Sequence, residues 1–260
     1  MAVGSAMLIP SSFERILIMD FQQVFSNIIM LISRYWQRYL IDGISNTLYL
    51  TFIAVIFGVL LGSVVAILKM SRFKIIRFFA SVYIEVIRGT PILLQLYIFY
   101  FVLPELLPFL DFDGFTWVAI ALSINSGAYV SEVIRSGIQA VDKGQTEASR
   151  SLGLGSSQTM LHIVLPQAVR NILPALGNEF IMILKETSLA STFFIGDLMT
   201  IHLQVSGAHY LPLESLTIVG IIYLCLTFPL SKLVAWFEKK MSTDKAYRSH
   251  KRHRKSKSNV

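Results

Sequence analysis

Residues 43–68 read GISNTLYLTFIAVIFGVLLGSVVAIL, and this stretch decides the fold class of the chain. It contains no acidic, basic or histidine side chain over its whole length. As an α-helix it would rise about 39 Å, whereas the hydrocarbon core of a bilayer is about 30 Å thick. We therefore expect residues 43–68 to form a helix that spans a membrane.

Four further stretches favour spans, within residues 79–103, 115–137, 163–187 and 213–236. Of the 260 residues, 54% are apolar and only 15% are charged, against about 25% charged in soluble domains. A soluble core of this size could not bury so much apolar surface. The predicted fold class is all-α, a polytopic membrane protein with five transmembrane helices.

Lys and Arg set the predicted orientation of these spans. They gather in the loops after the first and third spans, whereas residues 104–114 and 197–213 contain none. Because basic loops stay in the cytoplasm, these two loops and the C-terminus are expected there, with the N-terminus outside. Arg15, Arg34 and Arg38 in the N-terminal segment run against this bias.

Residues 1–42 are predicted to be an N-terminal amphipathic segment, with a helix at 12–40 lying on a membrane face. A first span here is the weaker alternative, because Asp20, Gln22 and Gln23 interrupt the apolar pattern. Residues 241–260 are predicted to be a basic cytoplasmic tail. Such a tail after a final span is typical of contact with membrane lipid headgroups, and we expect no nucleic acid as a partner.

The predicted cytoplasmic loop at residues 140–166, AVDKGQTEASRSLGLGSSQTMLHIVLP, is too patterned for a plain connection. Thr146 is placed to cap a first short helix, with Glu147 in its first turn. Ser156 or Ser157 would cap a second short helix, and Pro166 would begin the next element.

Gly153 and Gly155 suit a helix stop and a sharp turn between these two helices. Leu152 and Leu154 would then lie exposed at the elbow. This pattern predicts an apolar knob that docks into a groove of a partner protein. A helix pair resting on the lipid surface is the alternative.

The residues of this loop carry a family resemblance. Glu147-Ala148-Ser149, Gly153 and Ile163-Val164-Leu165-Pro166 resemble the EAA signature in membrane subunits of ATP-binding-cassette importers, with Ser149 where alanine is commoner. Further motifs resemble permeases of the polar amino-acid group, of the histidine and glutamine type. They are Asn46-Thr47-Leu48, Ile87-Arg88-Gly89-Thr90-Pro91 with Gln95, Ala128-Tyr129 with Glu132 and Arg135, Lys143-Gly144-Gln145, and Lys185 with Thr187-Ser188-Leu189.

The resemblance covers residues 43–240 and implies a type I importer permease domain with a cytoplasmic coupling loop at 140–166. It implies an ATPase partner chain that holds ATP and Mg, an extracytoplasmic solute-binding protein, and a second permease copy or a sister permease. The implied location is the prokaryotic cytoplasmic membrane. The implied ATPase-coupling residues are Glu147, Ala148, Ser149, Leu152, Gly153, Leu154, Ile163, Leu165 and Pro166.

Polar side chains inside the predicted spans indicate a substrate path. Pro91 disfavours helical geometry at Thr90, so the second span is expected to break beside Arg88, which could meet a substrate carboxylate. An internal Glu85–Arg88 pair is an equally good interpretation, and a Glu132–Arg135 pair is expected to be structural. The predicted path residues are Arg88, Thr90, Gln95, Glu179, Lys185, Glu186, Thr187 and Ser188.

The sequence predicts a subunit that is not itself an enzyme. No G-x-x-x-x-G-K-[ST] loop is present, so ATP hydrolysis must come from another chain. One cysteine, Cys225, excludes a disulfide framework, and the five histidines form no i,i+4 pair, so no metal site is expected. The alternatives are an ion-coupled secondary amino-acid carrier using Glu179, a membrane enzyme, and a scaffold that only recruits a partner.

Overall fold

The computed structural model describes residues 21–257, and the side chains of residues 21–241. Within this range every regular element is helical, which confirms the all-α prediction. The α-helices are α2 (Phe21–Gln37), α3 (Ile44–Lys69), α4 (Lys74–Gly89), α5 (Ile92–Tyr97), α6 (Leu103–Leu106), α7 (Gly114–Gln139), α8 (Lys143–Ser151), α9 (Ser156–Thr159), α10 (Leu165–Glu186), α11 (Leu198–His209) and α12 (Pro212–Lys257). Short π-helical turns are η1 (Arg38–Gly43), η2 (Ile98–Val102) and η3 (Met160–Val164), and η4 (Thr187–Phe193) is a 3₁₀ helix.

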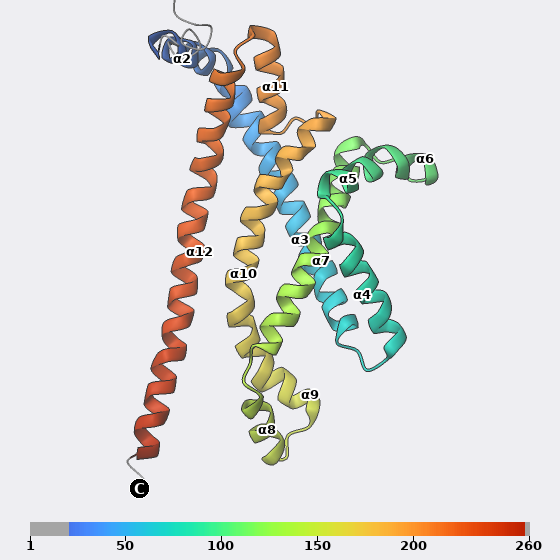
Figure 1. Ribbon diagram of the computed structural model, residues 1–260, viewed down its shortest axis with the longest axis vertical. Coiled ribbons are helices and arrows are strands. Elements are labelled where there is room, and N and C mark those ends of the chain that lie inside the picture. The colour runs from blue at the N-terminus through green and yellow to red at the C-terminus, as the bar shows by residue number, and fades with distance from the viewer. Residues whose placement is uncertain (1–20, 258–260) are drawn as a thin grey trace, which may run out of the picture.

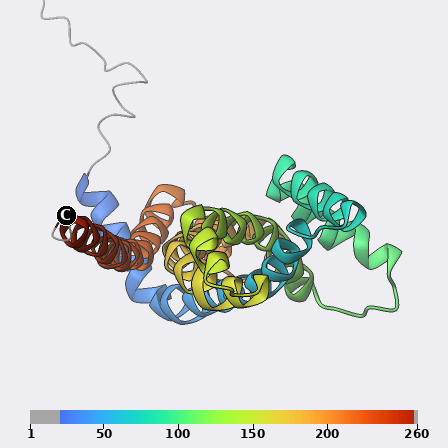
Figure 2. The same ribbon diagram turned by 90° about the horizontal axis from the view of Figure 1, so that it is seen from below.

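Helices α3, α7 and α10 form the centre of an elongated bundle (Figure 1). Helix α4 and the arm α5–η2–α6 lie on one side of it, and α12 with α2 and α11 lies on the other (Figures 1 and 2). The turn between α8 and α9 is at one end of the bundle, and α2 and α11 are at the opposite end (Figure 1). The two ends thus match the alternation of loops that the sequence predicts.

Small residues let α3 and α7 approach closely. A Cβ atom on Gly58 would lie 2.4 Å from Ser126 Oγ, and one on Gly62 would lie 2.8 Å from Gly127 O. In lipid, such close backbone contact is a main source of helix association. The small residues that recur every four positions on each helix are all buried here: Ala54, Gly58, Gly62 and Ala66 on α3, and Ala119, Ser123, Gly127 and Ser131 on α7.

Each of the five predicted spans is largely helical, but not every one is a single long apolar helix. Among the described residues, Phe21–Lys69, Gly114–Gln139 and Pro212–Met241 are long and apolar enough to cross a membrane. The second predicted span is broken, because Lys74–Gly89 and Ile92–Leu106 meet at 104°. The fourth corresponds to α10, which is not among the described helices that meet this standard of length and apolarity.

The N-terminal helix α2 is tied to α11 and α12 by polar side chains. Asn27 Nδ2 donates to Glu214 Oε1 at 2.9 Å, and the Tyr35 hydroxyl lies 2.8 Å from His209 Nε2. Arg38 also donates to Gln204 of α11. The interfacial position predicted for residues 12–40 stays a prediction, and residues 12–20 lie outside the described residues, as do 258–260 of the basic tail.

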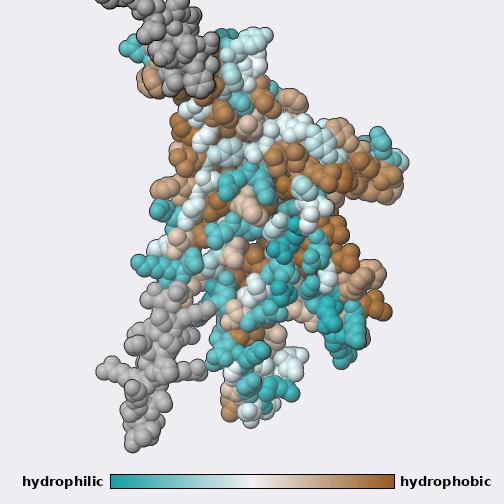
Figure 3. Space-filling model, in the orientation of Figure 1, coloured by the Kyte–Doolittle hydropathy of each residue, from teal (hydrophilic) through white to brown (hydrophobic). Residues whose placement is uncertain are grey.

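The surface of the bundle is divided by polarity. Hydrophobic side chains cover the outer side of α4, whereas hydrophilic ones gather over α4, α7 and α10 on the face toward the viewer (Figure 3). The outward apolar residues of α4 include Ile75, Phe78, Phe79 and Val86, each more than half exposed. A helix of a soluble protein would not expose these side chains, and lipid is the solvent that suits them.

Candidate functional site

The knob predicted at residues 140–166 is present, but its first helix begins earlier than expected. Helix α8 starts at Lys143, and the Asp142 carboxylate caps it by accepting from Gly144 N at 2.8 Å. The predicted Thr146 cap is therefore wrong, because Asp142, a better cap residue than threonine, lies about one turn nearer the N-terminus. Thr146 and Glu147 both lie inside α8.

The turn at Gly153 is confirmed. Gly153 has φ +87°, a left-handed conformation that costs a non-glycine residue about 1–2 kcal/mol. It follows the C-terminus of α8, where a left-handed glycine is common. The Ser149 hydroxyl then donates to Thr159 Oγ1 at 3.1 Å, which fixes α8 against α9 beneath the turn.

The second short helix of the prediction is not a separate element. Neither Ser156 nor Ser157 is its cap: the N-cap position is Gly155, whose N–H donates to Gln158 Oε1 at 2.9 Å. Backbone dihedrals stay helical from α9 through η3 into α10. Pro166 lies in the first turn of α10, as predicted, but this turn follows the π turn without a break in the helical backbone. The second half of the knob, α9 with η3, and the fourth span are therefore parts of one helix.

The nine predicted coupling residues all lie on this knob or at its junction with α10. The Leu152 side chain is 81% exposed and Leu161 is 59% exposed, although both are apolar. Such exposed apolar side chains at a protruding turn are typical of a protein-binding surface. Glu147, Ala148, Leu152, Gly153, Leu165 and Pro166 are exposed, Leu154 and Ile163 are half-buried, and Ser149 is buried.

The break in the second span lies at Thr90-Pro91, as predicted. Thr90 and Pro91 have extended backbone, with ψ values of 145° and 135°. Gln95 closes the gap, because its Nε2 donates to Ile87 O and Thr90 Oγ1, both at 2.8 Å. Its Oε1 accepts from Asn125 Nδ2 at 2.9 Å. Gln95 is thus a buried bridge between the broken helix and α7.

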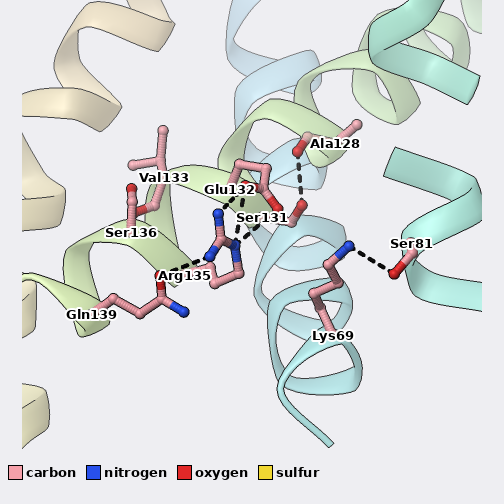
Figure 4. A network of polar contacts seen from close by, with 9 residues as sticks. All are labelled: Lys69, Ser81, Ala128, Ser131, Glu132, Val133, Arg135, Ser136 and Gln139. Carbon is pink, nitrogen blue, oxygen red and sulfur yellow. Dashed lines mark hydrogen bonds and ion pairs between the residues drawn. The ribbon is translucent and has the colours of Figure 1, made fainter. Parts of the chain in front are cut away.

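Arg88 contacts an aromatic ring of α7. Its guanidinium lies over the Tyr129 ring of α7, 5.2 Å from the ring centre. The alternative pair with Glu85 does not form, since among the described residues the one ion pair joins Arg135 to Glu132, with Nη2 and Oε2 2.6 Å apart. Figure 4 shows this pair, with Gln139 beside it and Lys69 donating to Ser81 of α4 at 2.7 Å.

The predicted path residues of α10 and η4 form a second group. Glu179 is 6% exposed and its Oε1 has no hydrogen-bond partner, with the Ser126 hydroxyl of α7 nearby. Glu186 has a buried oxygen without a partner too, and Lys185 is exposed. Thr187 and Ser188 instead donate to the backbone, at Leu184 O and Lys185 O.

Helix α7 connects the two groups. Asn125 meets Gln95 of α5, and its neighbour Ser126 faces Glu179 of α10. Asn125 and Ser126 were not among the predicted path residues. The sequence feature that could have marked this position is an amide side chain in an apolar span, because a polar group there needs a hydrogen-bond partner. Among the described residues, no cluster of His, Cys, Asp and Glu is arranged to hold a metal ion.

Together, the helical bundle, the broken span and the knob define a membrane transport component. Residues 58–243 match the family described as "binding-protein-dependent transport system inner membrane component". The chain belongs to this family.

Two similar proteins match most of the chain. It is 41% identical to the arginine transport system permease protein ArtQ of Bacillus subtilis (strain 168), over 79% of this chain and 94% of that protein. It is also 41% identical to the putative glutamine transport system permease protein GlnP of Rickettsia bellii (strain RML369-C), over 78% and 93%.

Solved structures agree with the fold. An amino acid ABC transporter solved with histidines has a chain 44% identical to this one, with a TM-score of 0.77 over 81% of this chain and 97% of that chain. The inward-facing MetNI methionine ABC transporter is 17% identical with a TM-score of 0.61, which shows the fold alone. The predicted type I importer permease fold is thereby confirmed.

Proposed function

We propose that this chain is the permease subunit of an ATP-driven importer of polar amino acids in the prokaryotic cytoplasmic membrane. The relatives named for arginine and glutamine transport support this substrate class, as does the amino acid transporter with the similar fold. Family membership favours an ABC importer over the ion-coupled secondary carrier. The same comparison argues against the membrane enzyme and the scaffold.

The observation that carries the mechanism is the continuity between the knob and α10. ATP and Mg would bind to a separate ATPase subunit, whose groove receives Leu152 and Leu161. Because α9, η3 and α10 form one helix, movement of the ATPase would be passed directly to Glu179. A ligand shifts an equilibrium only by its differential affinity for the two states, so the knob must stay bound in both.

The remaining partners follow from the same proposal. A solute-binding protein would deliver substrate at the end that carries α11, and a second permease copy or a sister permease would complete the pore. The C-terminal tail would lie in the cytoplasm against anionic lipid. The chain would itself bind no nucleotide and perform no catalysis.

The substrate path would use the charges that the protein leaves unpaired. Thr90, Gln95, Thr187 and Ser188 are hydrogen-bonded within the protein and would position the backbone around the path. Arg88, Glu179, Lys185 and Glu186 would be left for the substrate, one sign for its carboxylate and the other for its ammonium group. Replacing each by its neutral counterpart should reduce uptake in at least one of the four variants. Unchanged uptake in all four would refute this assignment.

Gly153 tests the coupling role. In vesicles holding the chain with its co-purified ATPase, Gly153→Val should insert normally but lower amino-acid uptake per ATP hydrolysed, because valine opposes the left-handed turn by about 1–2 kcal/mol. Gly153→Asn is the matched control, since asparagine adopts this conformation more readily, and it should keep most of the coupling. Equal uptake per ATP in both variants and the parent would contradict the role.

A further inference from the structure

Helix α4 has three distinct faces along its length. Ala80 and Ile84 are buried against the bundle, while Phe78, Val82 and Val86 face outward. Between these faces runs a third, polar stripe that occupies an arc of about 80° at 100° per residue. It consists of Lys74, Arg77, Ser81, Glu85 and Arg88.

A second polar stripe runs along α7. Its members are spaced alternately four and three residues apart, so they share one face of the helix. They are Asn125, Tyr129, Glu132, Ser136 and Gln139. We call the two stripes together the polar track.

Contacts show that the two stripes face each other. Arg88 of α4 lies over the Tyr129 ring of α7. Lys69, at the end of α3, donates to Ser81 of α4 and is within electrostatic reach of Glu132 of α7, as is Arg88. Hydrophilic side chains gather over this part of the molecule in the space-filling view (Figure 3), and its lower part is seen from close by in Figure 4.

The polar track runs from the basic end of the bundle to the helix break. Lys74 lies beside the α3–α4 connection, and Arg88 directly precedes the break at Thr90. The distance between them along α4 is about 21 Å, which is about two-thirds of a hydrocarbon core. At its inner end, Asn125 donates to Gln95, which closes the break.

Lipid is a poor solvent for the middle of this track. Glu85 is exposed, yet it has no ion pair among the described residues, and it lies about one turn from the break. A charge in hydrocarbon costs at least about 2.5 kcal/mol, so such side chains face protein or water. The polar stripe on α4 is therefore expected to face water and not the hydrocarbon chains of the lipid.

We propose that the polar track lines the water-filled cytoplasmic half of the route by which substrate leaves the protein. This inference rests on the proposed function for the identity of the transported solute. With Lys69, the track and its flanking Arg135 hold five cations and two anions, a net charge of +3. That sign favours solutes that carry a carboxylate, with Arg88 as the innermost residue to meet it.

Cysteine accessibility tests the track directly. In a Cys225→Ser background, which removes the exposed native thiol, Ser81→Cys and Glu85→Cys place thiols on the track. Val82→Cys and Val86→Cys are matched controls one residue along on the outward face. The full chain, with its ATPase, is treated in inside-out vesicles with a membrane-impermeant methanethiosulfonate. Only a thiol in water ionises and reacts readily, so the track thiols should react at least about tenfold faster than the controls.

Two results would overturn the inference. One is similar rates at all four positions; the other is reaction at Ser81→Cys alone, which would mean that the stripe only reaches lipid headgroups at the surface. Labelling needs insertion but no transport, whereas uptake by the unlabelled parent vesicles tests the proposed function separately. A failure of uptake with the expected labelling would refute the function and leave the aqueous track standing.

Discussion

Gln95 offers the sharpest test of how the broken span is held together. Replacing it by leucine keeps the size of the side chain but removes two donated bonds of 2.8 Å and the acceptor for Asn125. Ile87 O and the Asn125 amide would lose partners in a site where Gln95 is only 6% exposed. An unsatisfied buried group costs about 1–3 kcal/mol, so Gln95→Leu should destabilise the fold by about 2–4 kcal/mol.

The measurement is the thermal unfolding midpoint of the purified chain in detergent. At about 2–4 °C per kcal/mol for a chain of this size, the midpoint should fall by about 4–16 °C. A double-mutant cycle with Asn125→Leu isolates the long-range bond. Because the double variant leaves no orphaned amide, its loss should be smaller than the sum of the single losses by about 1 kcal/mol.

A loss below about 0.5 kcal/mol in Gln95→Leu would put it in the range of ordinary surface substitutions and refute the bridging role. Strict additivity in the cycle would refute the contact with Asn125 specifically. Uptake should fall along with stability, since the bridge positions Arg88 at the break.

Two further predictions concern packing and pH. Gly58→Ala should lower the free energy of unfolding by about 1–3 kcal/mol, measured by thermal unfolding, because the added methyl group overpacks against Ser126. Gly220→Ala is the control, since nothing lies within 4 Å of its Cβ, and it should be neutral or slightly stabilising. Equal losses of stability in the two variants would contradict the close approach of α3 and α7. Hydrogen bonds from the Thr116 hydroxyl and N–H lower the pKa of Asp113, the N-cap of α7. The ionised Asp113 carboxylate therefore stabilises the fold above its unfolded pKa of about 3.9. This stabilisation is lost as the pH falls through the lower pKa of the folded state. Asp113→Ala should lose about 1 kcal/mol at pH 7 and converge with the parent in acid; a constant difference down to pH 2 would argue against it.

Much of the fold could be predicted from local sequence. The uncharged run at 43–68 became α3, the Thr90-Pro91 pair broke the second span, and Gly153 formed the turn of the knob. In each case a single residue type or an apolar run restricts the backbone to few conformations. The length of the apolar run and backbone sterics were therefore enough to predict these three features.

Other features depended on choices that local sequence leaves open. Asp142 and Thr146 are both competent caps, and only the packed knob selects the first. Pro166 is typical of a helix start, but the π turn before it lets one helix run through. The bond between Gln95 and Asn125 joins residues 30 positions apart, so no local pattern could reveal it.

The unbroken helix from Ser156 to Glu186 has a mechanical consequence. It is about 46 Å long, so a tilt of about 5° about one end displaces the other by about 4 Å. Under the proposed function, a small tilt of this helix at the knob would therefore become a displacement of several ångströms at Glu186. Pro166 and Pro174 are the points where such a helix would bend, so bending at these two residues would reduce the displacement that reaches its far end.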